Sequence, residues 1–128
     1  MTAQIEVLEP ELDRLEDLWS DGLSDTYQAY MATVDEPKLA LAAALIEVGI
    51  RLQGLGGRAA PATTLLMGDL CLARGSRLLA DHAPLAVQVA FARAIELLSA
   101  KAAADEPAPA ARQLLRASLT ASRAASTT

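Results

Sequence analysis

The stretch LALAAALIEVGIRLQ, residues 39–53, most constrains the fold because it is apolar on nearly every face. Alanine and leucine are strong helix formers, and Pro37 just before the stretch suits a first helical turn. A helix that is apolar all round is either buried on all sides or lies at an interface. The chain is therefore expected to fold around this helix or to present it to a partner.

The rest of the chain is also expected to be helical. Hydrophobic residues make up 52% of the 128 residues and are mostly alanine and leucine, whereas aromatic residues, which favour strands, make up only 3%. Apolar spacing predicts helices near residues 9–20, 24–31, 37–53, 62–80, 83–103 and 110–119. We expect one helical domain over residues 1–105, followed over residues 106–128 by a proline-containing linker, a short helix and a flexible tail.

Charge is unevenly spread along the chain, whose formal net charge is −5. The first 36 residues hold ten acidic residues against the single Arg14, and the remainder holds ten basic and six acidic ones. This acidic segment is either a solvated helix face or a patch that meets a basic partner. Nucleic acid is not expected as a partner, because there is no basic stripe and almost no aromatic residue for base stacking.

The single cysteine, Cys71, excludes an internal disulfide and is interpreted as a small core residue in an apolar helix. No apolar run approaches the roughly 20 residues that span a bilayer, and the acidic N-terminus does not resemble a signal peptide. We therefore expect a cytoplasmic protein without a membrane span.

Candidate catalytic groups are few. His82 is the only histidine and is expected in a turn, and a zinc site would need several Cys or His ligands. The GLGG stretch at residues 54–57 follows no strand, so it does not predict a phosphate loop. We expect no catalytic residue and no bound metal in this chain.

Three acids interrupt apolar helices, namely Glu47, Asp69 and Glu96. Unpaired buried carboxylates are costly, so each is expected to pair with an arginine or a helix end. Arg51 lies four residues after Glu47, which suits a pair on one helix face. The other candidate bases are Arg74, Arg77 and Arg93.

The stretch LLMGDLCLARGSRLLA, residues 65–80, resembles a helix of the trans-prenyl diphosphate synthases, with the form apolar-x-GD-(Y/F)-L-L-(A/S)-x-A. The residues that match are Met67, Gly68, Asp69, Leu72 and Ala73. Glu47 lies where the preceding family helix carries a glutamate, and FARAIELLSAKAA resembles the following helix. The resemblance implies a truncated isoprenoid-synthase-like bundle of five to six helices.

The aspartate-rich motif of that family is absent at its expected place. Counted on from Glu47, its three aspartates fall at Gly57, Arg58 and Pro61, whose side chains offer magnesium no oxygen ligand. The resemblance therefore implies the fold and argues against prenyl-transfer activity in this chain alone.

The chain is similar to the small subunits of bacterial heteromeric hexaprenyl and heptaprenyl diphosphate synthases. IRLQ (residues 50–53) resembles their M-R-M-Q, RAIELLSAKA (residues 93–102) resembles their R-I-N-E-L-K, and the similarity covers residues 38–105. It implies a non-catalytic regulatory subunit that completes a heterodimer with a catalytic large subunit and helps set prenyl chain length. Mg²⁺ is then expected in the partner subunit and not in this chain.

The resemblance also implies site residues. The expected subunit interface consists of Gly68, Asp69, Leu72, Ala73, Gly75 and Ser76. Candidates for the floor of a product tunnel are Met67, Leu70 and Phe91, although such residues at helical spacing also make ordinary cores. The alternative is a stand-alone all-α interaction or homodimerisation module without prenyl chemistry, and the chain alone is expected to be able to self-associate.

Overall fold

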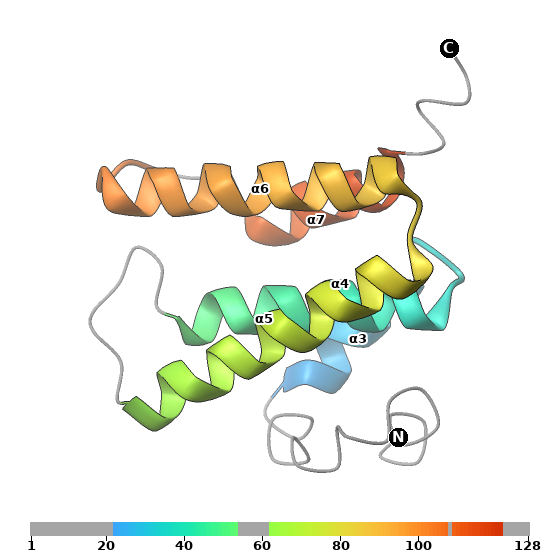
Figure 1. Cartoon of the computed structure of the whole chain (residues 1–128), viewed down its shortest axis with the longest axis horizontal. Coiled ribbons are helices and arrows are strands. Elements are labelled where there is room, and N and C mark those ends of the chain that lie inside the picture. The colour runs from blue at the N-terminus through green and yellow to red at the C-terminus, as the bar shows by residue number, and fades with distance from the viewer. Residues whose placement is uncertain (1–21, 54–61, 108, 122–128) are drawn as a thin grey trace.

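The computed structural model describes residues 22–53, 62–107 and 109–121, and in these the chain forms helices and no strand (Figure 1). The helices are α3 (Ser24–Met31), α4 (Pro37–Leu52), α5 (Ala62–His82), α6 (Leu85–Ala103) and α7 (Ala111–Leu119). The expected all-α class is confirmed as a bundle of five helices over these residues. The helix expected near residues 9–20 and the C-terminal tail lie outside the described residues.

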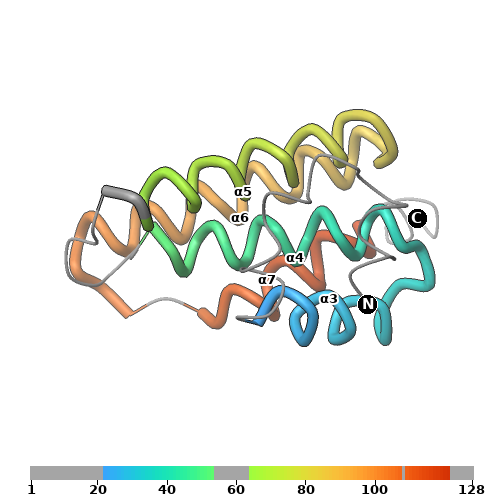
Figure 2. Tube along the Cα trace, turned by 90° about the horizontal axis from the view of Figure 1, so that it is seen from below, coloured from blue at the N-terminus to red at the C-terminus, as the bar shows by residue number. Residues whose placement is uncertain are grey.

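Helix α4 is the centre of the bundle. In Figure 1, α6 and α7 lie on one side of it and α3 on the other, and α5 packs along it; Figure 2 shows α3 and α5 flanking it from a second direction. Every residue from Leu39 to Ile50 is buried, which includes faces that a surface helix would leave polar. The apolar character of residues 39–53 on all sides is thus explained by neighbours on all sides, and the core interpretation of this stretch is confirmed.

Glycines allow α4 and α5 to pack closely. A Cβ placed on Gly75 of α5 would lie 2.7 Å from Cγ1 of Ile46 and 2.8 Å from the carbonyl oxygen of Ala42. A Cβ on Gly49 of α4 would lie 2.7 Å from Cγ of Leu72 and 3.0 Å from the carbonyl oxygen of Gly68. These distances leave no room for a side chain, so the close contact accounts for glycine inside two helices where alanine has the better propensity.

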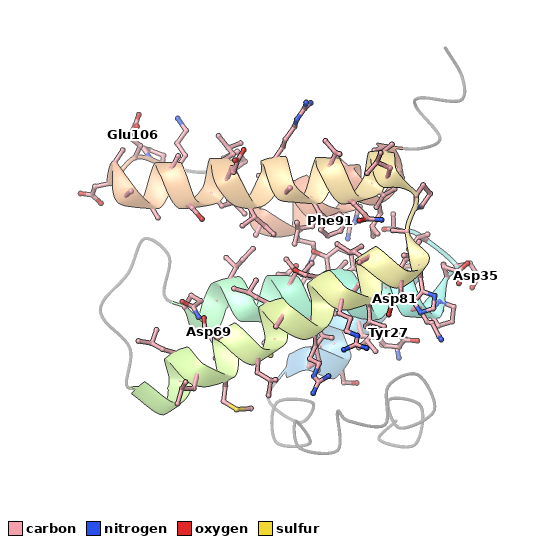
Figure 3. All side chains as sticks on the ribbon, viewed as in Figure 1. Tyr27, Asp35, Asp69, Asp81, Phe91 and Glu106 are labelled. Atoms are coloured by element: carbon pink, nitrogen blue, oxygen red, sulfur yellow. The ribbon has the colours of Figure 1, made fainter. Side chains whose placement is uncertain are left out.

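Helix α6 packs on the bundle with one face. Its buried residues are Val87, Phe91, Ala94 and Leu98, at spacings of four, three and four. Figure 3 shows Phe91 pointing from α6 toward the side of the bundle that contains α4 and α5. The opposite face of α6 is exposed to solvent.

Helix α7 belongs to the same core, although we expected a domain that ends at residue 105. Its Leu115 is fully buried and Leu119 nearly so. The chain turns back after α6 because Asp105 adopts a left-handed conformation (φ 54°), and the amide of Glu106 then donates to the carbonyl of Lys101 at 2.9 Å. This pattern ends a helix and reverses the chain, and it brings α7 alongside α4 (Figure 2). The expected linker therefore connects two parts of one core.

None of the described helices is both long and apolar enough to cross a membrane.

Candidate functional site

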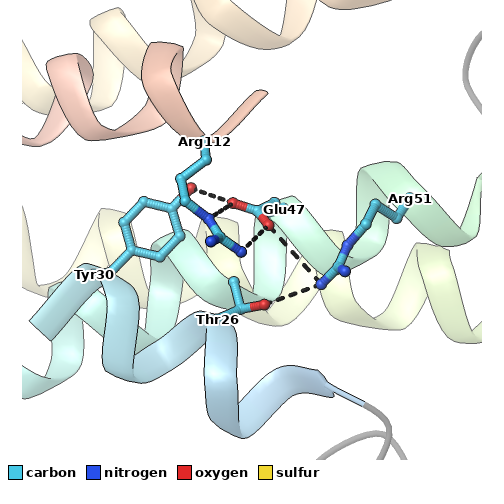
Figure 4. Close-up of polar contacts among 5 residues, drawn as sticks. All are labelled: Thr26, Tyr30, Glu47, Arg51 and Arg112. Atoms are coloured by element: carbon cyan, nitrogen blue, oxygen red, sulfur yellow. Dashed lines mark hydrogen bonds and ion pairs between the residues drawn. The ribbon is translucent and has the colours of Figure 1, made fainter. Parts of the chain in front are cut away.

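A buried polar cluster joins α3, α4 and α7 (Figure 4). Its centre is Glu47, which is only 5% exposed in the middle of α4. The hydroxyl of Tyr30 donates to Oε1 of Glu47 at 2.7 Å. Arg112 approaches from α7 and donates from Nε to Oε1 at 3.1 Å and from Nη2 to Oε2 at 2.9 Å. Both oxygens of this buried carboxylate are therefore satisfied.

Arg51 is a weaker partner of Glu47 than its spacing of four residues suggested. Its Nη2 lies 3.9 Å from Oε2 of Glu47, and it donates a hydrogen bond to Oγ1 of Thr26 at 3.0 Å. The expected pair exists, but the two-point contact comes from Arg112. We did not predict Arg112 or Tyr30 as partners, because no local spacing relates them to Glu47; the one available signal was the presence of an acid in a wholly apolar helix.

The cluster fixes the protonation of its members. Burial alone would raise the pKa of Glu47, but the hydrogen bonds from Arg112 and Tyr30 and the charges of Arg112 and Arg51 together hold that pKa below its usual value. Burial and the hydrogen bond to Glu47 raise the pKa of Tyr30. Glu47 is thus ionised and Tyr30 neutral near pH 7. Because the carboxylate already accepts three hydrogen bonds, the cluster is suited to tying helices together and not to accepting a proton.

Asp69 lies on the surface and not in the core. Its Oδ1 accepts a hydrogen bond from Nε2 of Gln53 at 2.7 Å, and the same nitrogen lies 3.0 Å from the carbonyl oxygen of Leu65. We expected Asp69 and Glu96 to be buried and paired with an arginine or a helix end. Both are exposed instead, and within the described residues neither side chain forms an ion pair. The reason is that α5 and α6 pack through one face only, and both acids lie on the outer face.

The six residues expected at a subunit interface divide into two groups. Gly68 and Gly75 are buried between α5 and α4, and Leu72 is half-buried against Gly49. Asp69, Ala73 and Ser76 are exposed on α5, with Ser76 at the edge of the groove toward α6, and Leu66 extends the same strip. Packing within the chain thus accounts for the glycines, and the exposed residues stay predicted partner contacts. We call residues 66, 69, 73 and 76 the outer strip of α5.

The three residues expected at a tunnel floor are not equivalent either. Phe91 is buried in the core. It borders a groove of about 220 Å³ between α5 and α6, which is also lined by Ser76 and Leu79. Met67 and Leu70 are half-buried and pack against the core from its edge. Their role in a tunnel stays a prediction.

The other chemically distinctive residues lie apart from one another. His82 is the last residue of α5 and is exposed, and Cys71 is fully buried. Burial raises the pKa of the Cys71 thiol to about 11. Across residues 22–53, 62–107 and 109–121, no group of three or more His, Cys, Asp and Glu side chains could hold a metal ion.

No protein-family model, no curated protein and no solved structure matches this chain. The similarity to the trans-prenyl diphosphate synthases therefore rests on the short motifs of its sequence.

Proposed function

We propose that this protein is the non-catalytic subunit of a cytoplasmic trans-polyprenyl diphosphate synthase. In this role it binds a catalytic large subunit, completes the active heterodimer and helps set the prenyl chain length. The observation that carries the proposal is the hydrogen bond of 2.7 Å between Gln53 and Asp69. It joins the end of IRLQ, which resembles the small subunits, to the GD of LLMGDLCLA, which resembles the trans-prenyl diphosphate synthases in general. Two stretches with separate resemblances therefore lie together in space.

The α4–α5 pair supports this proposal further. Gly68 of the GD motif lies against α4, where a Cβ would lie 3.2 Å from the carbonyl oxygen of Gly49. The motif thus positions α5 so that the outer strip of α5 faces away from the core. Small side chains such as Ala73 and Ser76 would let a partner helix approach closely. A carboxylate has two oxygens, and the bond to Gln53 uses one, which leaves Asp69 able to accept a contact from a partner.

The state of Glu47 is consistent with a subunit that performs no chemistry itself. Its carboxylate is saturated by Tyr30 and Arg112, and it therefore serves packing. In this proposal, the magnesium and the diphosphate are held by the large subunit.

The test is co-purification with a large synthase subunit from the same genome that carries two D-D-x-x-D motifs. The tagged chain and this subunit are expressed together and assayed with isopentenyl and farnesyl diphosphates and Mg²⁺. We expect the chains to co-elute and long prenyl diphosphates to form only when both are present. A large subunit that is fully active alone and does not bind this chain would overturn the proposal.

Variants of the outer strip sharpen this test. Asp69→Ala removes the expected partner contact, and we expect it to lower the affinity of the complex. It also removes the hydrogen bond from Gln53, so the free energy of unfolding should fall by about 0.5–1.5 kcal/mol. Gln113→Ala, at an exposed position of α7, is the matched control and is expected to leave binding unchanged. If Asp69→Ala changes neither stability nor binding, Asp69 has no role at the interface.

The alternative, a stand-alone interaction module, is favoured by a different observation. Leu85, Val89 and Leu97 are exposed on α6, away from the GD motif. A chain that self-associates and binds no synthase subunit would support this second function.

A further inference from the structure

The outer face of α6 carries an unusual share of exposed apolar surface. Among the described residues, the large exposed hydrophobic side chains are Leu66 on α5 and three on α6, namely Leu85 (73% exposed), Val89 (39%) and Leu97 (38%). Contact between such side chains and water is unfavourable, and a cluster of them on one helix marks an interaction surface.

The outer face also has the spacing of a coiled-coil seam. Outward positions alternate at intervals of three and four through Ala86, Val89, Arg93, Glu96, Ala100 and Ala103, and all six are exposed. This is the spacing at which one helix packs along another. We call these six residues the α6 seam. The surface therefore fits a helix, and the charges at its centre indicate which one.

Arg93 and Glu96 lie on either side of the midpoint of α6, which runs from Leu85 to Ala103. They are the charged residues of an otherwise apolar seam. Within the described parts of the chain, neither takes part in an ion pair or hydrogen bond. A partner that supplies an acid opposite Arg93 and a base opposite Glu96 would complement both.

We propose that this partner is a second copy of the same chain, with the two α6 helices packed antiparallel about a two-fold axis. In that arrangement Arg93 of each copy faces Glu96 of the other, so one axis produces two ion pairs. A parallel pair would instead place Arg93 opposite Arg93 and Glu96 opposite Glu96, which is repulsive. The charges thus select the antiparallel direction and fix the register.

The same register matches the sizes of the other side chains. It places Val89 opposite Ala100 and Ala86 opposite Ala103, so no two large residues of the seam meet. Leu97 lies beside the seam, close to Ala90 of the other copy. Ala90, Arg93 and Leu97 border an apolar groove of about 360 Å³ between α6 and α7, which is lined further by Leu114 and Ala117. The two-fold axis brings the grooves of the two copies together, so each Leu97 can be covered by the groove wall at Ala90 of the other copy.

This inference goes beyond the proposed function and does not depend on it, because the α6 seam is separate from the outer strip of α5. It concerns the chain alone and can be tested without a synthase subunit.

The first experiment measures association of the full chain by sedimentation equilibrium. We expect a dimer whose dissociation constant rises at least tenfold in Arg93→Glu and in Glu96→Arg, since each substitution creates like-charge contacts. An equimolar mixture of the two variants restores both ion pairs and is expected to restore the dimer. Arg77→Glu, an equal charge change on the exposed side of α5, is the control that leaves association unchanged.

A second experiment tests the register. Chains carrying Val89→Cys and chains carrying Ala100→Cys are mixed and oxidised, and we expect a disulfide-linked dimer. Each variant alone places its two new cysteines 11 residues apart along the pair, about 16 Å at the rise of a helix, and is not expected to cross-link. The native Cys71 is buried and is the same in all samples.

The proposal is overturned by a wild-type chain that stays monomeric at millimolar concentration, or by variants that associate as the wild type does. A dimer that the mixed charge variants fail to restore, or that cross-links equally well with Val89→Cys alone, shows another interface and also overturns it.

Discussion

Arg112 binds Glu47 through two parallel hydrogen bonds, from Nε to Oε1 at 3.1 Å and from Nη2 to Oε2 at 2.9 Å, across 65 residues of sequence. Glu47 lies in the middle of the central helix α4, and Arg112 lies in the first turn of α7. Tyr30 adds a third helix to the same carboxylate. The contact therefore holds α7 in the core.

Arg112→Ala should destabilise the whole bundle, because it leaves a buried carboxylate without its main partner. We expect the free energy of unfolding in urea to fall by about 2 kcal/mol, the range for a hydrogen-bonded charged group, since the Arg112 side chain is 41% exposed and water replaces part of its contact. Arg77→Ala, at a position of α5 that is 73% exposed and takes no part in the cluster, serves as the control and should stay near the wild type. If the two variants were equally stable, the Arg112–Glu47 pair would contribute nothing to the free energy of unfolding.

Acid should weaken the fold through Glu47. The pKa of Glu47 is lower in the folded than in the unfolded chain, so its contribution is present above the unfolded pKa and is lost as the pH falls through the folded pKa. We expect the melting temperature of Glu47→Gln to be lower than that of the wild type at pH 7 and to depend less on pH below pH 5. A wild-type and variant curve that run parallel down to pH 3 would contradict this assignment.

Alkali should act through Tyr30 with the opposite sign. Its pKa is higher in the folded chain, so the neutral phenol stabilises the fold below the unfolded pKa, about 10, and this contribution is lost as the pH rises above that value. Tyr30→Phe should lower stability at pH 7 by about 1–2 kcal/mol, because it removes a hydrogen bond to a charged group. Its stability between pH 9 and pH 11 should fall less than that of the wild type. Tyrosine absorbance recorded during the same titration should show that the loss of stability at high pH coincides with ionisation of a tyrosine.

The glycines of α5 should respond differently to alanine. In Gly75→Ala, the new methyl group meets the backbone of Ala42 and Ile46 at 2.8–3.2 Å, and overpacking of about 1–3 kcal/mol exceeds the helix-propensity gain of about 1 kcal/mol. In Gly68→Ala, the nearest atom is Nε2 of Gln53 at 3.0 Å, on a side chain that can move. The backbone contact, to the carbonyl oxygen of Gly49, is 3.2 Å, against 2.8 Å to the carbonyl oxygen of Ala42 at Gly75. We therefore expect a clear loss of stability for Gly75→Ala and nearly unchanged stability for Gly68→Ala in chemical denaturation. The reverse order would contradict the α4–α5 geometry.

The Cys71 thiol should be unreactive in the folded chain. Burial raises its pKa to about 11, so at pH 8 it is almost wholly protonated as well as inaccessible. We expect an aromatic disulfide reagent to react roughly 100-fold or more slowly with the native chain than with the denatured chain, since the thiolate is the reactive form. Rapid labelling of the native chain would place Cys71 at a surface.

Local sequence pattern predicted the helices well. The apolar stretch 39–53 indicated a helix that is either buried on all sides or at an interface, and α5 and α6 closely match the segments expected at residues 62–80 and 83–103. These agreements follow from properties that act within one helix, namely propensity, apolar spacing and the prolines that begin a helix. The domain expected to end at residue 105 did not include α7, because linker composition does not reveal that α7 packs back into the same core.

The sequence by itself determined that the chain is helical, that α4 is apolar on every side, and that Glu47 needs a partner. Only the tertiary structure decided that the partner is Arg112, that Asp69 binds Gln53 at the surface, and that Gly75 faces the backbone of α4. The physical reason is the distance along the sequence between the groups that interact. Helix formation depends on neighbours within a few residues, whereas satisfying a buried charge and closing the gap between helices depend on groups that only the folded chain brings together.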